Sequence, residues 1–227
     1  MNYNLNFHFL LNYRQVLWEG LLNTMQLSFT IMVSGFLLGT VIALLRLSQH
    51  QGVRMVGQIY VNLLRNLPSL IVLFWFFYAL PLFTGVQVSR FLTAWLAFTL
   101  YTAAYFCEIL RGSLQKIPNG QWEAAEMLGF SRRRAFIVLM LPQALRHALP
   151  ALVNEVIEIV KISAIAATIA FPELLSQARM ISDSEYRPVE TYTAVAVIIM
   201  VFILLLSAIA WLIENRFSPS TRVTHHD

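Results

Sequence analysis

Charge is scarce in this sequence. Only 12% of its 227 residues are charged, whereas 58% are apolar, and the mean hydropathy is +0.63. Soluble domains usually carry about 25% charged residues, so the composition excludes an ordinary water-soluble enzyme as well as a disordered chain. In a bilayer, the same length makes roughly five helices of about 20 residues plus their loops. We therefore expect an all-α polytopic membrane protein.

Cysteine and lysine are also rare. The single cysteine, Cys107, cannot form an intrachain disulfide. A Walker A loop needs Gly-Lys-Ser/Thr to cradle phosphates, but the two lysines of this chain follow Gln115 and Val160. The sequence also lacks His-Glu-x-x-His, Gly-x-Ser-x-Gly and any Cys/His cluster with zinc spacing. These absences predict that the chain is not an enzyme, holds no metal or cofactor and hydrolyses no ATP.

Five apolar segments approach the length that spans a bilayer core. We predict membrane spans at 20–45, 66–89, 91–110, 148–171 and 191–213, all within one domain that covers 1–227. The longest connection between spans is the loop 111–147, and the largest on the opposite side is the loop 172–190.

The basic residues are unevenly divided between the two sides of these spans. With the N-terminus outside, eleven of the sixteen are cytoplasmic: Arg46, Arg54, Arg65, Arg111, Lys116, Arg132, Arg133, Arg134, Arg146, Arg216 and Arg222. Four are outside, namely Arg14, Arg90, Arg179 and Arg187, and Lys161 lies within a span. Cytoplasmic loops carry the excess of Lys and Arg, so we predict an outside N-terminus and a cytoplasmic C-terminus.

The longer loop contains one short predicted helix, 121–128. Gly120 ends a Pro-Asn-Gly sequence that is typical of a helix start, and Gly129 is a typical helix stop. Glu123 falls in the first predicted turn, where the helix dipole favours negative charge.

This helix has a small, smooth surface at Ala124 and Ala125, which suits the groove of another protein. Because an isolated helix of this length is unstable in water, another structure must hold it. A second interpretation is that the loop only sets membrane topology through its arginines 132–134. The residues by themselves leave both interpretations open.

The fourth predicted span carries charges. Glu155, Glu158 and Lys161 recur every three residues, so they spread over about 120° of one helical face, and Glu158 can pair with Lys161. Such groups need partners or water within a membrane. They form either the wall of a substrate pathway, where a zwitterion meets both signs of charge, or a salt bridge that joins helices or subunits.

Two further patterns concern packing. Glu108 and Arg111 form a second i,i+3 pair near the inner end of the third span, and we predict that this structural pair anchors the following loop. Gly35 and Gly39 form Gly-x-x-x-Gly in the first span, which permits close helix packing.

Several motifs together resemble a known family. Glu123-Ala124-Ala125, Gly129, Leu139 and Leu141-Pro142 resemble the EAA loop of binding-protein-dependent ABC transporter permeases, although that family prefers Ile at the place of Leu139. The sequences Glu108-Ile-Leu-Arg-Gly112, Gly120-Gln-Trp-Glu-Ala-Ala125, Leu141-Pro-Gln-Ala-Leu-Arg146 and Arg65-Asn-Leu-Pro68 resemble the polar amino-acid uptake subfamily of histidine, glutamine and glutamate type.

The resemblance implies a type I importer permease with five spans in the bacterial cytoplasmic (inner) membrane. The helix 121–128 would be seated in a cytoplasmic ATPase, with Gly120, Glu123, Ala124, Ala125 and Gly129 as coupling residues. ATP and Mg²⁺ would belong to that ATPase dimer. The other implied partners are a second permease copy or paralogue, an external amino-acid-binding protein and a polar amino acid, but no nucleic acid.

The substrate class depends on 161–164. Many relatives carry Lys-Asp-Thr-Ser there, whereas this chain has Lys161-Ile-Ser163-Ala. Lys161 and Ser163 resemble the glutamate/aspartate-type permeases, and a lost carboxylate beside a kept lysine suits an acidic amino acid. The same change also fits a partner permease that holds the substrate. A rival of another class is an ion-coupled secondary transporter or channel with Glu155, Glu158 and Lys161 as a proton relay.

Overall fold

Helices make up the fold of the described residues, 4–217, in a computed structural model, and no strand occurs among them. In chain order they are η1 (His8–Tyr13), α1 (Arg14–Arg46), α2 (Gln51–Arg65), α3 (Ser69–Phe74), η2 (Trp75–Ala79), α4 (Leu80–Thr84), α5 (Arg90–Gln115), α6 (Asn119–Met127), α7 (Arg132–Ala135), η3 (Phe136–Met140), α8 (Leu141–Ser163), η4 (Ala164–Ile169), α9 (Leu174–Glu185) and α10 (Pro188–Phe217). Segments η1 and η4 are 3₁₀-helices, whereas η2 and η3 are π-helices. The prediction of an all-α chain is confirmed for this part.

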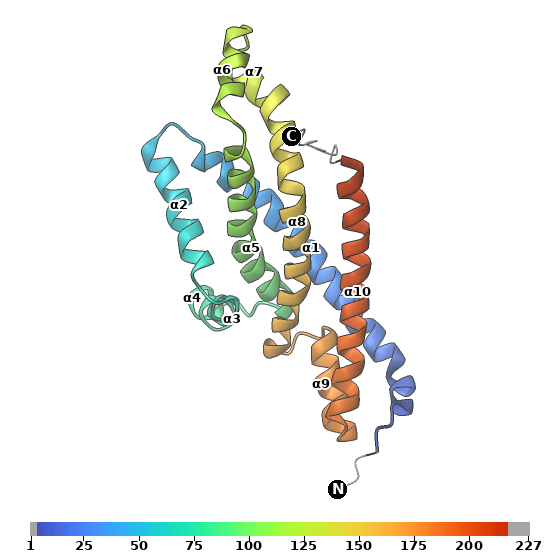
Figure 1. Ribbon diagram of the computed structural model, residues 1–227. Helices are drawn as coiled ribbons and strands as arrows, with labels where there is room; N and C mark the ends of the chain where they lie inside the picture. The colour runs from blue at the N-terminus through green and yellow to red at the C-terminus, as the bar shows by residue number, and fades with distance from the viewer. Residues whose placement is uncertain (1–3, 218–227) are drawn as a thin grey trace.

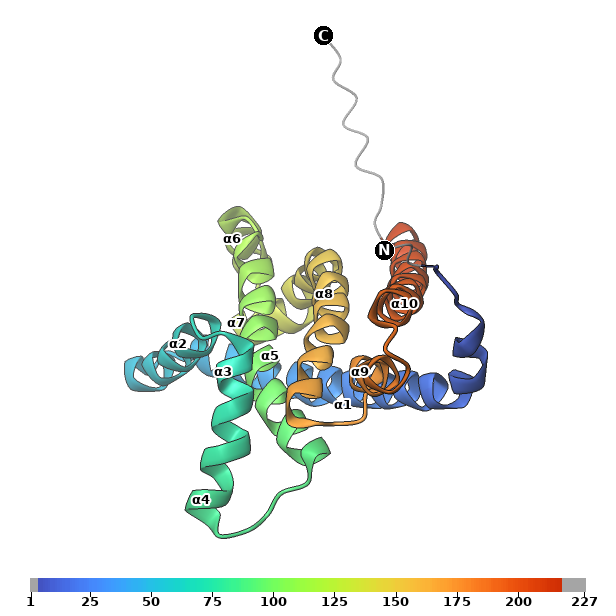
Figure 2. The ribbon, with the colours of Figure 1, turned by 90° about the horizontal axis from the view of Figure 1, so that it is seen from below.

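Different elements lie at the two ends of the helix bundle (Figure 1). The helix α6 and the end of α10 lie at one end, and η1 and α9 lie at the other. The helix α1 crosses obliquely behind α5, α8 and α10, while α2 flanks α5 on the side away from α10 (Figure 2). The loop 111–147 and the end of α10 therefore share one side of the bundle.

Three helical segments are long and apolar enough to cross a membrane: His8–Arg46, Arg90–Gln115 and Pro188–Leu212. Two bent pairs pass the same test only together. The pair Gln51–Arg65 and Ser69–Thr84 is bent by 104°, and the pair Arg132–Ile169 and Leu174–Glu185 by 48°. Length and composition thus give three to five spans.

Part of both bent pairs was not predicted from the sequence. The segment predicted as 66–89 is helical only within the second arm of the first pair, and α2 had no prediction because its polar residues interrupt the apolar pattern. The predicted loop 172–190 is mostly helix α9, whose first amides are capped by the buried Glu173. Glutamate is an unusual residue at that position, so the helix start gave no clear signal.

The two π-helices share one physical cause. Each ends two residues before a proline, Pro81 after η2 and Pro142 after η3. A proline has no amide hydrogen and collides with the carbonyl four residues earlier, so the preceding turn cannot keep regular α-helical hydrogen bonds. A wider turn accommodates this misfit. The element boundaries in this region are therefore set by proline.

The core depends on close contact between α1 and α5. A β-carbon on Gly35 would stand 2.4 Å from Thr102 Oγ1, and one on Gly39 would stand 2.6 Å from Phe106 Cβ. The predicted role of this glycine pair in close packing is confirmed.

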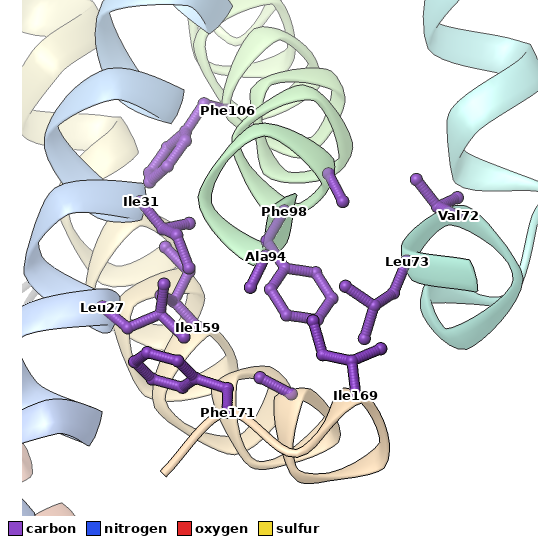
Figure 3. Packing of buried hydrophobic residues seen from close by; sticks show 12 residues of the cluster. Leu27, Ile31, Val72, Leu73, Ala94, Phe98, Phe106, Ile159, Ile169 and Phe171 are labelled. Atoms are coloured by element: carbon purple, nitrogen blue, oxygen red, sulfur yellow. The ribbon is translucent and has the colours of Figure 1, made fainter. Parts of the chain in front are cut away.

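Around that contact, one apolar cluster joins residues from five helical elements (Figure 3). Its fully or nearly fully buried members include Leu27 and Ile31 from α1, Leu73 from α3, Phe98 and Phe106 from α5, Ile159 from α8 and Ile169 from η4. This packing fixes α8, and with it the charged residues of the fourth predicted span, against α1 and α5.

Candidate functional site

The first candidate site is the short helix α6, which ends in a well-defined cap. Gly129 has a φ of +78°, and its amide donates to Glu126 O at 2.9 Å. The Phe130 amide donates to Ala125 O at 3.0 Å. These two bonds form a Schellman motif, which needs a left-handed residue where only glycine is free of strain. The prediction that Gly129 stops this helix is confirmed.

Ala125 and Ala124 lie on different sides of α6. Ala125 is 2% exposed and packs in a cluster with Ile117, Ala135 and Met140, whereas Ala124 is exposed. The prediction of one docking surface made by both alanines is wrong for Ala125, because the helix turns that side chain toward α7 and α8.

The exposed surface of α6 is more apolar than the alanines alone suggested. Met127 and Leu128 are 85% and 76% exposed at its end, and Gly120 and Glu123 are exposed as well. The helix begins at Asn119, so Glu123 lies beyond the first turn, contrary to the prediction. Beside the helix is a hollow of about 570 Å³ between α6 and α7. A protruding helix with two exposed apolar side chains is a surface suited to a protein partner.

An ion cluster ties the base of this region to the bundle. Glu108 forms the predicted pair with Arg111 on α5, and it also accepts a hydrogen bond at 2.6 Å from Arg46, the last residue of α1. Arg46 was not predicted as a partner because the pairing crosses 62 positions of the chain. Glu108 thus joins the ends of two long helices directly before the chain enters α6.

The second candidate site is the charged stretch of α8. Glu158 and Lys161 form the predicted ion pair, and their side chains are 53% and 48% exposed. Glu155 is 7% exposed and belongs to the buried side of the helix.

Ser163 does not share the surface of this pair. It is fully buried, and its hydroxyl donates to Val160 O at 2.7 Å within the same helix. Two positions along a helix turn a side chain by about 200°, which carries Ser163 away from Lys161. Ser163 therefore does not share a surface with Lys161, and its place in a substrate pathway stays a prediction.

Residues of α2 and α5 interact with the charged stretch of α8, and the sequence did not predict these interactions. The hydroxyls of Tyr101 and Tyr105 on α5 are 2.9 Å apart, and the Arg65 guanidinium lies 5.4 Å from the centre of the Tyr105 ring. Arg65 interacts electrostatically with Glu155, and both glutamates of α8 interact with Tyr101. The only indication in the sequence was the four-residue spacing of Tyr101 and Tyr105 on α5. The tertiary structure brings α2 and α8 to these tyrosines.

Comparison with known proteins identifies the family of this chain. Residues 35–219 match the family described as binding-protein-dependent transport system inner membrane component. The chain belongs to this family. It is 32% identical over 200 residues to the probable amino-acid ABC transporter permease protein YckA of Bacillus subtilis (strain 168), covering 88% of each chain.

Two further similarities cover a comparable length. The chain is 35% identical over 208 residues to the nopaline transport system permease protein NocM of Agrobacterium fabrum, covering 88% of this chain and 86% of NocM. A crystal structure of an amino acid ABC transporter with histidines has a chain with a TM-score of 0.90 and 33% identity, covering 94% of this chain and 100% of that one.

Both candidate sites lie within the region that matches this permease family. The matched region includes α6 and α8, so the exposed helix and the charged stretch are parts of the family domain. Within the described residues, no group of three or more His, Cys, Asp or Glu side chains is arranged to hold a metal ion.

Proposed function

We propose that this chain is the translocation subunit of an ABC importer for polar amino acids and that it prefers acidic ones such as glutamate and aspartate. The supporting observation is the half-exposed Glu158–Lys161 pair beside the buried Glu155. Ionisable side chains in membrane segments are costly and mark substrate or ion pathways. The names of the similar permeases and of the similar structure also favour amino acids as the class of cargo.

An exchange of ion pairs accounts for binding of a zwitterion at this site. The substrate carboxylate replaces Glu158 at Lys161, and the substrate ammonium pairs with the released Glu158 or with Glu155. Each charge keeps a partner, so the exchange avoids leaving an unpaired ion in a low-dielectric site. Arg65 interacts electrostatically with Glu155, and it supplies the additional cation that a second substrate carboxylate needs.

The same proposal assigns the partners. Two ATPase subunits, which carry ATP and Mg²⁺, dock on α6 from the cytoplasm, and an external binding protein delivers the amino acid. A second permease copy or paralogue completes the path. Each bent helix pair counts as one span in the bacterial cytoplasmic membrane, giving five spans with the N-terminus outside. The binding-protein-dependent family disfavours the ion-coupled alternative, which needs no such partners.

Transport by the reconstituted complex tests the function. The permease, its ATPase and its binding protein are placed in proteoliposomes, and ATP-driven uptake of labelled glutamate is challenged with unlabelled aspartate, glutamine and histidine. Aspartate should compete more strongly than histidine. Lys161→Met should abolish uptake while the complex keeps its subunit content and basal ATP hydrolysis. Unchanged uptake would remove Lys161 from the site, and loss of assembly would assign the pair a structural role.

A further inference from the structure

A strongly basic cavity lies where α1, α2, α5, α6 and α7 meet. It has a volume of about 770 Å³, and five arginines line it: Arg46, Arg54, Arg111, Arg132 and Arg133. It contains neither the exposed end of α6 nor the charged stretch of α8, so neither part of the proposed function uses it.

The charge of this cavity is not balanced by the residues around it. Its lining includes no aspartate or glutamate. Glu108 pairs with Arg46 and Arg111, but none of the ion pairs in the described part of the chain includes Arg54, Arg132 or Arg133. Several cations that converge on one hollow create a local positive potential that attracts an anion.

The position of the cavity indicates which anion. Arg46 ends α1, and Leu114 and Gln115 on the cavity wall end α5. Both helices belong to segments that are long and apolar enough to cross a membrane. The cavity lies at the end of both, on the side where such segments leave the hydrocarbon core and meet the lipid headgroups.

Exposed apolar side chains continue from this cavity along two helices. Leu47, which lines the cavity, is 47% exposed, and Leu44 before it is 55% exposed. On α2, Met55 is 50% exposed and lies one helical turn before the cavity residue Gln58. A surface of this kind suits acyl chains next to a bound headgroup.

We propose that this cavity binds the phosphodiester headgroup of an anionic phospholipid, with its acyl chains against α1 and α2. Guanidinium groups match phosphate oxygens in bidentate geometry, and basic pockets between membrane helices bind anionic headgroups. Inorganic phosphate offers the same oxygens but lacks the acyl chains that the adjoining apolar surface would contact. The proposal concerns lipid binding and does not depend on which solute is transported.

Lipid retention by the whole permease–ATPase complex tests this site. Complexes in nanodiscs of phosphatidylcholine with graded phosphatidylglycerol are released into detergent, and the phosphatidylglycerol bound per complex is measured by native mass spectrometry. The variant Arg54→Gln/Arg133→Gln removes two cavity cations. The control Arg134→Gln/Arg146→Gln removes the same charge from residues that do not line the cavity.

The cavity variant should need about 30-fold more phosphatidylglycerol for half occupancy, since each basic residue near an anionic surface contributes about fivefold. The control should stay within about threefold of the unmodified complex. Arg54→Gln alone should give about fivefold, and it covers the case in which the double variant fails to fold. Equal losses in the two double variants would overturn the site, because only general surface attraction would remain.

Two further measurements distinguish a bound lipid from the other possible occupants of the cavity, free phosphate and the ATPase. Inorganic phosphate added to the complex in phosphatidylglycerol nanodiscs should not displace the bound lipid, and displacement at matched concentration would assign the cavity to free phosphate instead. The permease should also retain the lipid when its ATPase is bound. Retention only after the ATPase is removed would mean that the ATPase fills the cavity, which would likewise overturn the proposal.

Discussion

Gly39 and Phe106 are in contact so close that a β-carbon added to Gly39 would stand 2.6 Å from Phe106 Cβ. The same added atom would stand 2.7 Å from the carbonyl oxygen of Ala103. One of these neighbours is backbone, so α1 must move away from α5 to admit even a methyl group. The register of α1 against α5 therefore depends on this glycine.

Gly39→Ala should lower the stability of the detergent-solubilised permease by about 1–3 kcal/mol, because overpacking forces backbone shifts. Thermal unfolding followed by a thiol-independent fluorescence assay measures the effect. Gly112→Ala on α5 is the matched control, because its β-carbon would meet nothing within 4 Å. Alanine is the better helix former by about 1 kcal/mol, so this control should be unchanged or more stable. Equal stability of the two variants would contradict the close contact.

Gly129→Val should disturb the end of α6. At a φ of +78° a residue with a β-carbon is strained by roughly 1–2 kcal/mol, and β-branching adds crowding. We expect weaker ATPase association and loss of substrate-stimulated ATP hydrolysis, with membrane insertion preserved. Co-purification of the ATPase and its stimulated turnover measure this. Gly129→Asn, which tolerates the left-handed conformation, should keep most of both, and equal defects in the two variants would refute the role of the cap.

Ala124 and Ala125 provide a sharper test of the docking surface because only one of them is exposed. Ala124→Trp should leave the unfolding temperature unchanged but block ATPase binding. Ala125→Trp should lower the unfolding temperature, since its side chain packs against Ile117 and Met140. Pull-down with the ATPase and thermal unfolding of the isolated permease separate the two effects. Normal ATPase binding by Ala124→Trp would show that α6 docks by another face.

The orientation of the chain is testable with single cysteines on the two ends of the bundle. Met127 at the end of α6 is 85% exposed, and the side chain of Asp183 on α9 is 74% exposed. With Cys107 replaced by alanine, a membrane-impermeant maleimide added to intact cells should label Asp183→Cys and spare Met127→Cys. Labelling in inverted vesicles should show the opposite pattern. Labelling of Met127→Cys from outside would reverse the proposed topology.

Local sequence patterns were sufficient for the class of the fold and for contacts within one helix. The Glu108–Arg111 and Glu158–Lys161 pairs follow from helical spacing, because residues three apart lie on the same face. The Gly129 cap follows from the conformational freedom of glycine. Each of these features depends only on residues that are close together in the sequence, so it can be predicted without the tertiary structure.

Contacts between helices were decided by the tertiary structure. Arg46 reaches Glu108 across 62 positions, and Arg65 reaches Tyr105 because α2 packs against α5. Ala125 rather than Ala124 is buried because α7 and α8 cover that side of α6. Helical periodicity indicates which residues share a face, but it does not specify which element packs against that face. Composition and periodicity therefore determined that this chain forms apolar membrane helices with a capped connecting helix. Three-dimensional packing decided which charges meet and which small residues are buried, because side chains distant in sequence become neighbours only after the helices have packed.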